Sequence, residues 1–163
     1  MSPMAPAYSQ ASLPEAVRVP TGNKVASETV GVGTIVYECR AKADMPGQFA
    51  WAFVGPTATL NDRSGKPVGR YAGPPATWTA NDGSALTATQ VAVAPNGAAN
   101  LSHQLVKANP ATGTGSSLYG VTYIQRVASQ GGVAPMALCD ASTLNARQTV
   151  NYQADYIFYK ASM

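Results

Sequence analysis

Charged residues are scarce in this chain: Asp, Glu, Lys and Arg make up 12% of its 163 residues, roughly half the usual share. The eleven basic residues are spread singly along the sequence, so we expect no nucleic-acid-binding surface, which needs a basic patch. The chain also lacks an apolar run of the roughly 18 residues that cross a membrane. These absences argue against a nucleic-acid partner and a helical membrane span.

Residues that bind transition metals or act as nucleophiles are also few. His103 is the only histidine, and Cys39 and Cys139 are the only cysteines. A zinc or copper site takes three or four such ligands, so we expect no such metal and no cofactor. A Ser-His-acid triad would have to use His103. The neighbouring Ser102 would face the opposite side of a strand, and no G-x-S-x-G elbow is present. The sequence therefore favours a protein that is not an enzyme.

What is present indicates a polar, uncharged β protein. With 163 residues and 45% hydrophobic content, the chain can build one ordinary core. We expect residues 14–163 to form a single domain and the Pro-punctuated residues 1–13 to be disordered or draped over it. The opening residues resemble a trimmed mature end behind an initiator methionine, so we expect an export signal to have been removed. Two cysteines in such a chain favour an oxidising compartment, although two separate buried thiols stay open as the alternative.

Alternating apolar and polar residues predict a series of short strands. The predicted strands are Gly33–Arg40, Phe49–Val54, Thr57–Leu60, Lys66–Ala72, Ala76–Ala80, Leu86–Ala94, Leu118–Val127 and Thr149–Tyr159. Asp82-Gly83 is the strongest hairpin signal, because these residues accept the positive φ angles of a tight turn. Leu101–Ala108 fits a strand or a short helix. We therefore predict an all-β fold, either an antiparallel sandwich or a closed barrel, with long loops.

Aromatic residues beside a stiff turn suggest a binding surface. Tyr71 and Trp78 flank Gly73-Pro74-Pro75, where a rigid loop could present exposed rings. Flat rings stack on sugar faces. We therefore expect Tyr71 and Trp78 to bind a glycan or cell-envelope polymer.

Carboxylates offer weaker hypotheses. Asp155 lies mid-strand among aromatic residues, and we predict that it forms an ion pair with Arg126 that sets the strand register. The alternative is that Asp155 is one of two catalytic carboxylates of a hydrolase. Asp62 and Asp82 lie in Asn/Asp/Ser/Gly segments that could hold calcium, but the same composition is what turns require.

Several motifs occur in an order that resembles a known family. They are Tyr37-x-Cys39, Trp51-x-Phe53-x-Gly55-Pro56-x-Ala58-x-Leu60, Gly65…Val68-Gly69, Ala72-Gly73-Pro74, Trp78, Asp82-Gly83-Ser84, Val121-Thr122-x-Ile124-Gln125-Arg126, Gly131-Gly132-x-Ala134-Pro135, Cys139 and Tyr152-x-Ala154-Asp155-Tyr156-x-Phe158-Tyr159. The chain resembles, from Leu13 to Lys160, a family of exported bacterial and fungal proteins catalogued as a domain of unknown function. The resemblance implies export and a Cys39–Cys139 disulfide. This chain departs from the family pattern at Arg70, where a histidine is common, and at Ser102-His103, where Pro-Trp is common.

Three functions are consistent with these features. The first is a secreted, periplasmic or extracellular binding or surface module without catalytic activity. The second is a cofactor-free secreted hydrolase that uses carboxylates including Asp155. The third is a structural surface protein that self-associates through sheet edges.

Overall fold

The computed structural model describes residues 9–162, and its regular elements are almost all strands. The strands are β1 Asn23–Ala41, β2 Phe49–Asn61, β3 Pro67–Ala72, β4 Thr77–Ala80, β5 Ser84–Ala94, β6 His103–Ala108, β7 Thr112–Gly113, β8 Val121–Gly131 and β9 Arg147–Ala161. Two single 3-10 turns, η1 Glu15–Val17 and η2 Ala141–Thr143, are the helical elements of the described chain. The all-β prediction is confirmed.

The strands form one antiparallel sheet that closes on itself. Its order is β4-β3-β2-β1-β9-β8-β6-β5, and a further pairing of β4 with β5 joins the two ends. The short β7 pairs with β5 alone, opposite Ser84 and Ala85. Of the two predicted architectures, the closed barrel is therefore the one that forms. Closure satisfies the edge hydrogen bonds that a flat sheet of this size leaves open.

Aromatic and branched side chains fill the interior of the barrel. On β9, Tyr152, Ala154, Tyr156 and Phe158 are all at most 4% exposed and face this core, which confirms the alternation predicted for that strand. Glycine in β1 allows the strands to approach closely, since a Cβ at Gly33 would collide with the backbone of β2.

The N-terminal segment covers one outer face of the barrel. Val17 and Val19 pack on a second core over β5, β6, β8 and β9, beside Ile157 and Tyr159. The fully buried Gln125 side chain ties the segment down, because its amide donates to the Val17 carbonyl at 2.8 Å. Residues 1–8 of the segment predicted to be disordered or draped lie outside the described residues.

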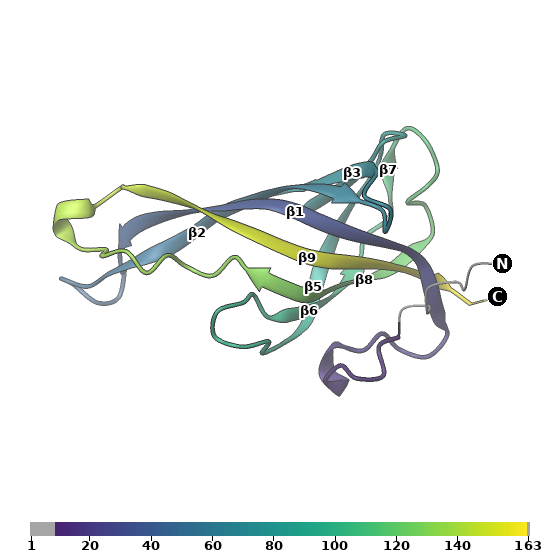
Figure 1. The fold of residues 1–163 in the computed structure, drawn as a ribbon, viewed down its shortest axis with the longest axis horizontal. Helices are drawn as coiled ribbons and strands as arrows, with labels where there is room; N and C mark the ends of the chain where they lie inside the picture. Colours follow the sequence, from purple (N-terminus) through teal and green to yellow (C-terminus); the bar gives the residue numbers. More distant parts are fainter. Residues whose placement is uncertain (1–8, 163) are drawn as a thin grey trace.

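Three strands extend beyond the barrel as an arm (Figure 1). β1 and β2 pair as far as Ala41 and Phe49, and β1 pairs with β9 as far as Glu38 and Arg147. We call the β1–β2 hairpin over 36–55, the start of β9 over 147–151 and the β8–β9 loop over 132–146 the arm. It lies at the end of the molecule opposite the chain termini (Figure 1).

Two features of the strand prediction change in the structure. The predicted strands Phe49–Val54 and Thr57–Leu60 are parts of the single strand β2, and the register with β1 shifts at Val54. This irregularity lets β2 turn from the arm into the barrel without ending. The ambiguous segment Leu101–Ala108 contains strand β6, because β5 and β8 supply hydrogen-bond partners on both sides.

Shortening the buried side chain of Val17 tests whether the N-terminal segment contributes to the stability of the fold. We expect Val17→Ala to lower the free energy of unfolding by about 2 kcal/mol, because Val17 is fully buried and loses two methyl groups from a packed site. The matched change Val91→Ala removes a side chain that is 54% exposed and should have little effect. Urea denaturation of both variants measures the difference, and equal midpoints would contradict this role of the segment.

Candidate functional site

The prediction that Tyr71 and Trp78 expose their rings to bind a ligand is wrong. Tyr71 and Trp78 are 7% and 2% exposed and belong to the barrel core. Their ring centroids are 4.8 Å apart, and Tyr71 also lies 4.9 Å from the ring of Tyr156. The turn between them reaches the surface, but each ring lies on the inward face of its strand. These residues therefore stabilise the barrel and present no stacking surface.

The predicted Arg126–Asp155 ion pair is also wrong. Asp155 accepts a hydrogen bond from Arg63 at 2.8 Å, and the same guanidinium contacts Glu28 at 2.8 Å. Arg126 is opposite the inward-facing Tyr156 in the ladder and donates to the Ser102 carbonyl at 3.1 Å. Neighbouring residues of β9 point to opposite faces, so Asp155 and Arg126 lie on different sides of the sheet. Because Asp155 forms an ion pair with Arg63, the structure does not support the alternative that Asp155 is a catalytic carboxylate.

The carboxylates of Asp62 and Asp82 are held by hydrogen bonds, Asp62 within its own turn and Asp82 also by the segment before β8. Asp62 accepts from the backbone amides of Ser64 and Lys66. One oxygen of Asp82 accepts from Ser84, and the other accepts from the backbone amides of Ser116 and Ser117 at 3.0 and 2.8 Å. Hydrogen bonds from Ser84, followed by those from Ser117, hold the pKa of Asp82 well below its usual range. Within residues 9–162, no cluster of three His, Cys, Asp or Glu has the arrangement of a metal site.

His103 begins strand β6, and within residues 9–162 no hydrogen bond joins its ring to a serine hydroxyl. Its Nδ1 is buried without a hydrogen-bond partner in the described structure. Burial, with a smaller contribution from the charge of Arg126, lowers the pKa of His103. The Ser102 hydroxyl contacts Arg126 at 3.4 Å. This arrangement does not form a Ser-His pair.

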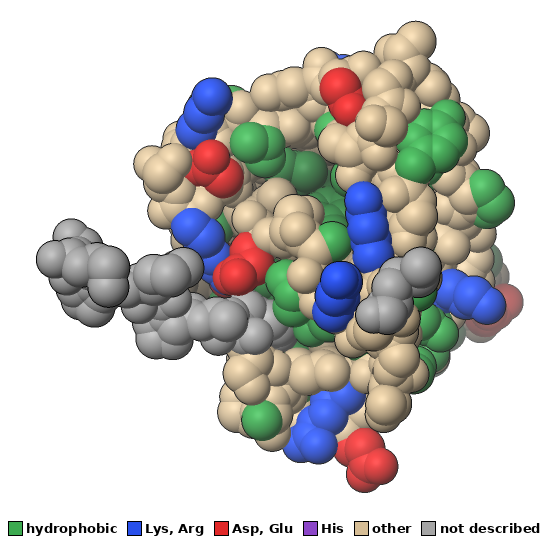
Figure 2. Space-filling model, turned by 90° about the vertical axis from the view of Figure 1, so that its right-hand side faces the viewer, with side chains coloured by type: hydrophobic (Ala, Val, Ile, Leu, Met, Phe, Trp, Pro, Cys, Tyr) green, Lys and Arg blue, Asp and Glu red, His purple; other side chains and the backbone are tan. Residues whose placement is uncertain are grey.

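A cavity of about 480 Å³ opens at the end of the barrel opposite the arm. We call it the barrel mouth. Its lining comes from the start of β1, the β2–β3 and β4–β5 turns, the segment before β8 and the end of β9. Figure 2 faces this end of the molecule and shows hydrophobic side chains in a hollow near its centre. Five separate parts of the chain therefore build one site.

The floor of the barrel mouth is apolar and its rim is polar. Leu60, Val68, Ala80, Leu118 and Phe158 supply the apolar lining, and Leu60, Leu118 and Phe158 are also part of the core. The rim contains charged and hydroxyl side chains, namely Ser27, Glu28, Asp62, Lys66, Asp82 and Ser117. The site can therefore surround an apolar body while a polar group stays at the surface.

Sequence reasoning did not find the barrel mouth. Its residues are spread from Ser27 to Phe158, and the motifs that contain some of them do not indicate that they share one site. The two Asp-containing turns were the nearest signal, since Asp62 and Asp82 both lie on the rim. Only closure of the ring brings these turns together.

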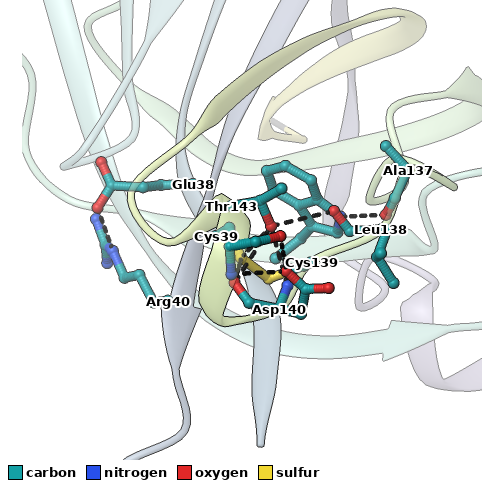
Figure 3. Close-up of a disulfide and its surroundings, with 10 residues drawn as sticks. Glu38, Cys39, Arg40, Ala137, Leu138, Cys139, Asp140 and Thr143 are labelled. Carbon is teal, nitrogen blue, oxygen red and sulfur yellow. Dashed lines mark hydrogen bonds and ion pairs between the residues drawn. A yellow bond between two sulfur atoms is a disulfide. The ribbon is translucent and has the colours of Figure 1, made fainter.

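The predicted Cys39–Cys139 disulfide is confirmed, and it joins β1 to the loop of the arm (Figure 3). The two Cα atoms are 5.5 Å apart and separated by 100 positions. Backbone hydrogen bonds from Cys39 to Ala146 and from Asn145 to Cys39 lie beside it. The indole of Trp51 donates to the Ala137 carbonyl at 2.8 Å. The loop is thus fixed over the aromatic face of the hairpin.

Removal of the disulfide tests its contribution to stability. We expect the double variant Cys39→Ala/Cys139→Ala to lose on the order of 4–5 kcal/mol of unfolding free energy, because a closed loop of 100 residues restricts the unfolded chain. Urea denaturation measures this loss against the oxidised protein. Unchanged midpoints would contradict the expectation, as would an intact mass showing two free thiols before reduction.

The Asp82 turn predicts a pH-dependent contribution to stability. Because the folded pKa of Asp82 is lowered, its contribution is present above the unfolded pKa and is lost as the pH falls through the folded value. We expect Asp82→Asn to lower the Tm at neutral pH, with the difference from the native protein shrinking below the ordinary aspartate range. Asp44→Asn is the control, because Asp44 is an exposed residue in the β1–β2 turn. Thermal unfolding across a pH series measures both, and equal Tm values at neutral pH would refute the prediction.

Comparisons with known proteins place the chain in a family without an assigned activity. No helix within residues 9–162 combines the length and hydropathy of a membrane span. No match was found among curated proteins or among solved structures. One family model, described as "Protein of unknown function (DUF3455)", matches residues 20–160. Since that match runs from before β1 to Lys160, near the end of β9, the chain belongs to the DUF3455 family.

Proposed function

We propose that this chain is an exported, non-catalytic binding protein that holds a small, mainly apolar molecule with one acidic group in the barrel mouth. The observation that carries the proposal is the cavity of about 480 Å³, with an apolar floor and a polar rim. Ligand pockets of proteins typically enclose about 300–1,000 Å³ and often lie in the mouths of barrels. Barrels of about eight strands have room for one small ligand.

Among the charged groups of the rim, Lys66 is the one that offers an ion-pair partner to an acidic group of a ligand. The three carboxylates of the rim are engaged within the protein: Glu28 with Arg63, Asp62 with its own turn and Asp82 with Ser84 and the segment before β8. The Lys66 side chain is exposed and forms no ion pair in the described structure. Its charge lowers the pKa of Asp62 only as the smallest of several causes. Lys66 is therefore the charged group of the rim that is best able to form an ion pair with an anionic ligand.

Export is supported by the covalent and surface chemistry of the chain. A disulfide between distant residues persists in oxidising compartments, and a chain with only 12% charged residues suits an extracellular β protein. We still propose that the ligand belongs to a cell-envelope polymer. An aliphatic or acidic part of that polymer would then occupy the barrel mouth. Glycan stacking on Tyr71 and Trp78 no longer supports it, because both rings are buried.

Binding of the dye 1-anilinonaphthalene-8-sulfonate tests the proposal, because its apolar rings and sulfonate match the floor and rim. We expect blue-shifted fluorescence that saturates at one dye per chain. Lys66→Gln should weaken binding roughly fivefold, the equivalent of about 1 kcal/mol for one exposed charge contact. Val68→Trp should weaken it more, because the larger side chain fills the floor.

Lys42→Gln is the matched control, since Lys42 is an exposed lysine on the arm at the other end of the molecule. It should bind the dye like the native protein. Circular dichroism in the aromatic region verifies that each variant stays folded, because partly unfolded proteins also bind this dye. Equal affinity of the native protein and Val68→Trp would contradict a site in the barrel mouth.

A further inference from the structure

One edge of the arm is open. Strand β2 pairs with β3 only from Thr57 onward, so its first part, Phe49–Val54, pairs with β1 alone among the described residues. We call Phe49–Val54 the arm edge. It contains no charged residue and no proline, the two devices with which natural proteins most often block an exposed strand.

The backbone groups of the arm edge point alternately toward β1 and away from it. Cys39 exchanges its hydrogen bonds with Asn145 and Ala146, on the β9 side. Cys39 therefore turns its N–H and C=O away from β2, and its ladder partner Trp51 does not exchange hydrogen bonds with it. It follows that the N–H and C=O of Trp51, and by alternation those of Phe49 and Phe53, face the open side.

The first five residues of the arm edge form a palindrome. Residues 49–53 read Phe-Ala-Trp-Ala-Phe, with Trp51 at the centre. We propose that the arm edge is a self-association surface, on which a second copy of this chain pairs antiparallel about a two-fold axis at Trp51. Phe49 then lies opposite the partner subunit's Phe53, and Trp51 lies opposite the partner subunit's Trp51. A two-fold axis requires such self-complementarity.

This pairing satisfies the open backbone groups. Each pair of outward-facing residues exchanges two hydrogen bonds in an antiparallel ladder, so the pairs formed by Phe49, Trp51 and Phe53 make about six. The three strands of each arm, β9, β1 and β2, join into one continuous sheet across the two chains. Aromatic residues directly opposite one another stabilise such a ladder.

Exposed apolar side chains on the edge and in the neighbouring loop support the same interface. Phe53 is 54% exposed although its ring packs edge-on against Tyr37 at 5.9 Å. Met136 and Leu138 are 101% and 71% exposed, and both adjoin Ala137, whose carbonyl accepts from Trp51. Apolar side chains on the aromatic face of the edge would thus lose water on pairing. Like charges do not oppose it, because the edge carries none.

The size of the surface indicates a reversible dimer. The arm edge and the neighbouring loop residues 134–138 amount to about a dozen residues, against roughly 20–30 on each side of a standard interface. We therefore expect dissociation in the micromolar range or weaker. The barrel mouth lies at the opposite end of the molecule, so both mouths stay open in the dimer, and this inference does not depend on the proposed ligand.

Sedimentation velocity over a concentration series tests the dimer. We expect the average mass to rise from the monomer value of 16.8 kDa toward twice that value. Phe53→Lys places a charge on the arm edge and should keep the chain monomeric at concentrations where the native protein is mostly dimeric. Val91→Lys is the matched control, because Val91 is also 54% exposed, and it should associate like the native protein.

Amide hydrogen exchange on the unaltered protein provides a second readout that does not depend on a variant folding. We expect the amides of Phe49, Trp51 and Phe53 to exchange rapidly in the dilute monomer and at least tenfold more slowly at high concentration. The amides of Ala50 and Ala52 should be protected in both states by β1. A monomer at all concentrations overturns the proposal, as does association with unchanged exchange at the arm edge. In that case the arm edge would be a site where an extended peptide of another protein can add as a strand.

Discussion

Closure of the ring depends on a short ladder between β4 and β5, in which Trp78 lies opposite Leu86. This ladder joins the two ends of the sheet. Because β4 has only four residues, its hydrogen bonds are few, and the packing of Trp78 against Tyr71 and Tyr156 supplies the apolar contacts that hold it. Without this closure the core would have one open side, and the barrel mouth would lose its wall at Thr79 and Ala80.

The two ends of the barrel are built for different chemistry. At one end, tight turns ring an apolar hollow, and their carboxylates are held by nearby hydroxyl and amide donors. At the other end, β1, β2 and β9 continue past the barrel and expose backbone and aromatic surface. The Cys39–Cys139 disulfide lies in the arm, at this second end. It holds the loop against the hairpin where the barrel core no longer does.

Strand identity was largely predictable, whereas the direction of key side chains was not. The alternation of Tyr152, Tyr156 and Phe158 correctly predicted the inner face of β9. The stiff turn between Tyr71 and Trp78 suggests a surface position for both, but strand alternation places their rings inside. The Arg126–Asp155 pair was plausible along the sequence, yet the two residues face opposite sides of the sheet, and Arg63 from another hairpin reaches Asp155. Strand register, which sets these neighbours, depends on bulges that composition does not reveal.

By itself, the sequence determined the all-β character and the turns, because these follow from local alternation and from Gly and Asp backbone preferences. The family resemblance added the Cys39–Cys139 disulfide. Only the tertiary structure decided that the sheet closes, that five separate segments line one cavity and that the edge of residues 49–54 stays open. The reason is physical: contacts between strands far apart in sequence depend on register and closure. Those are properties of the whole sheet and not of any one segment.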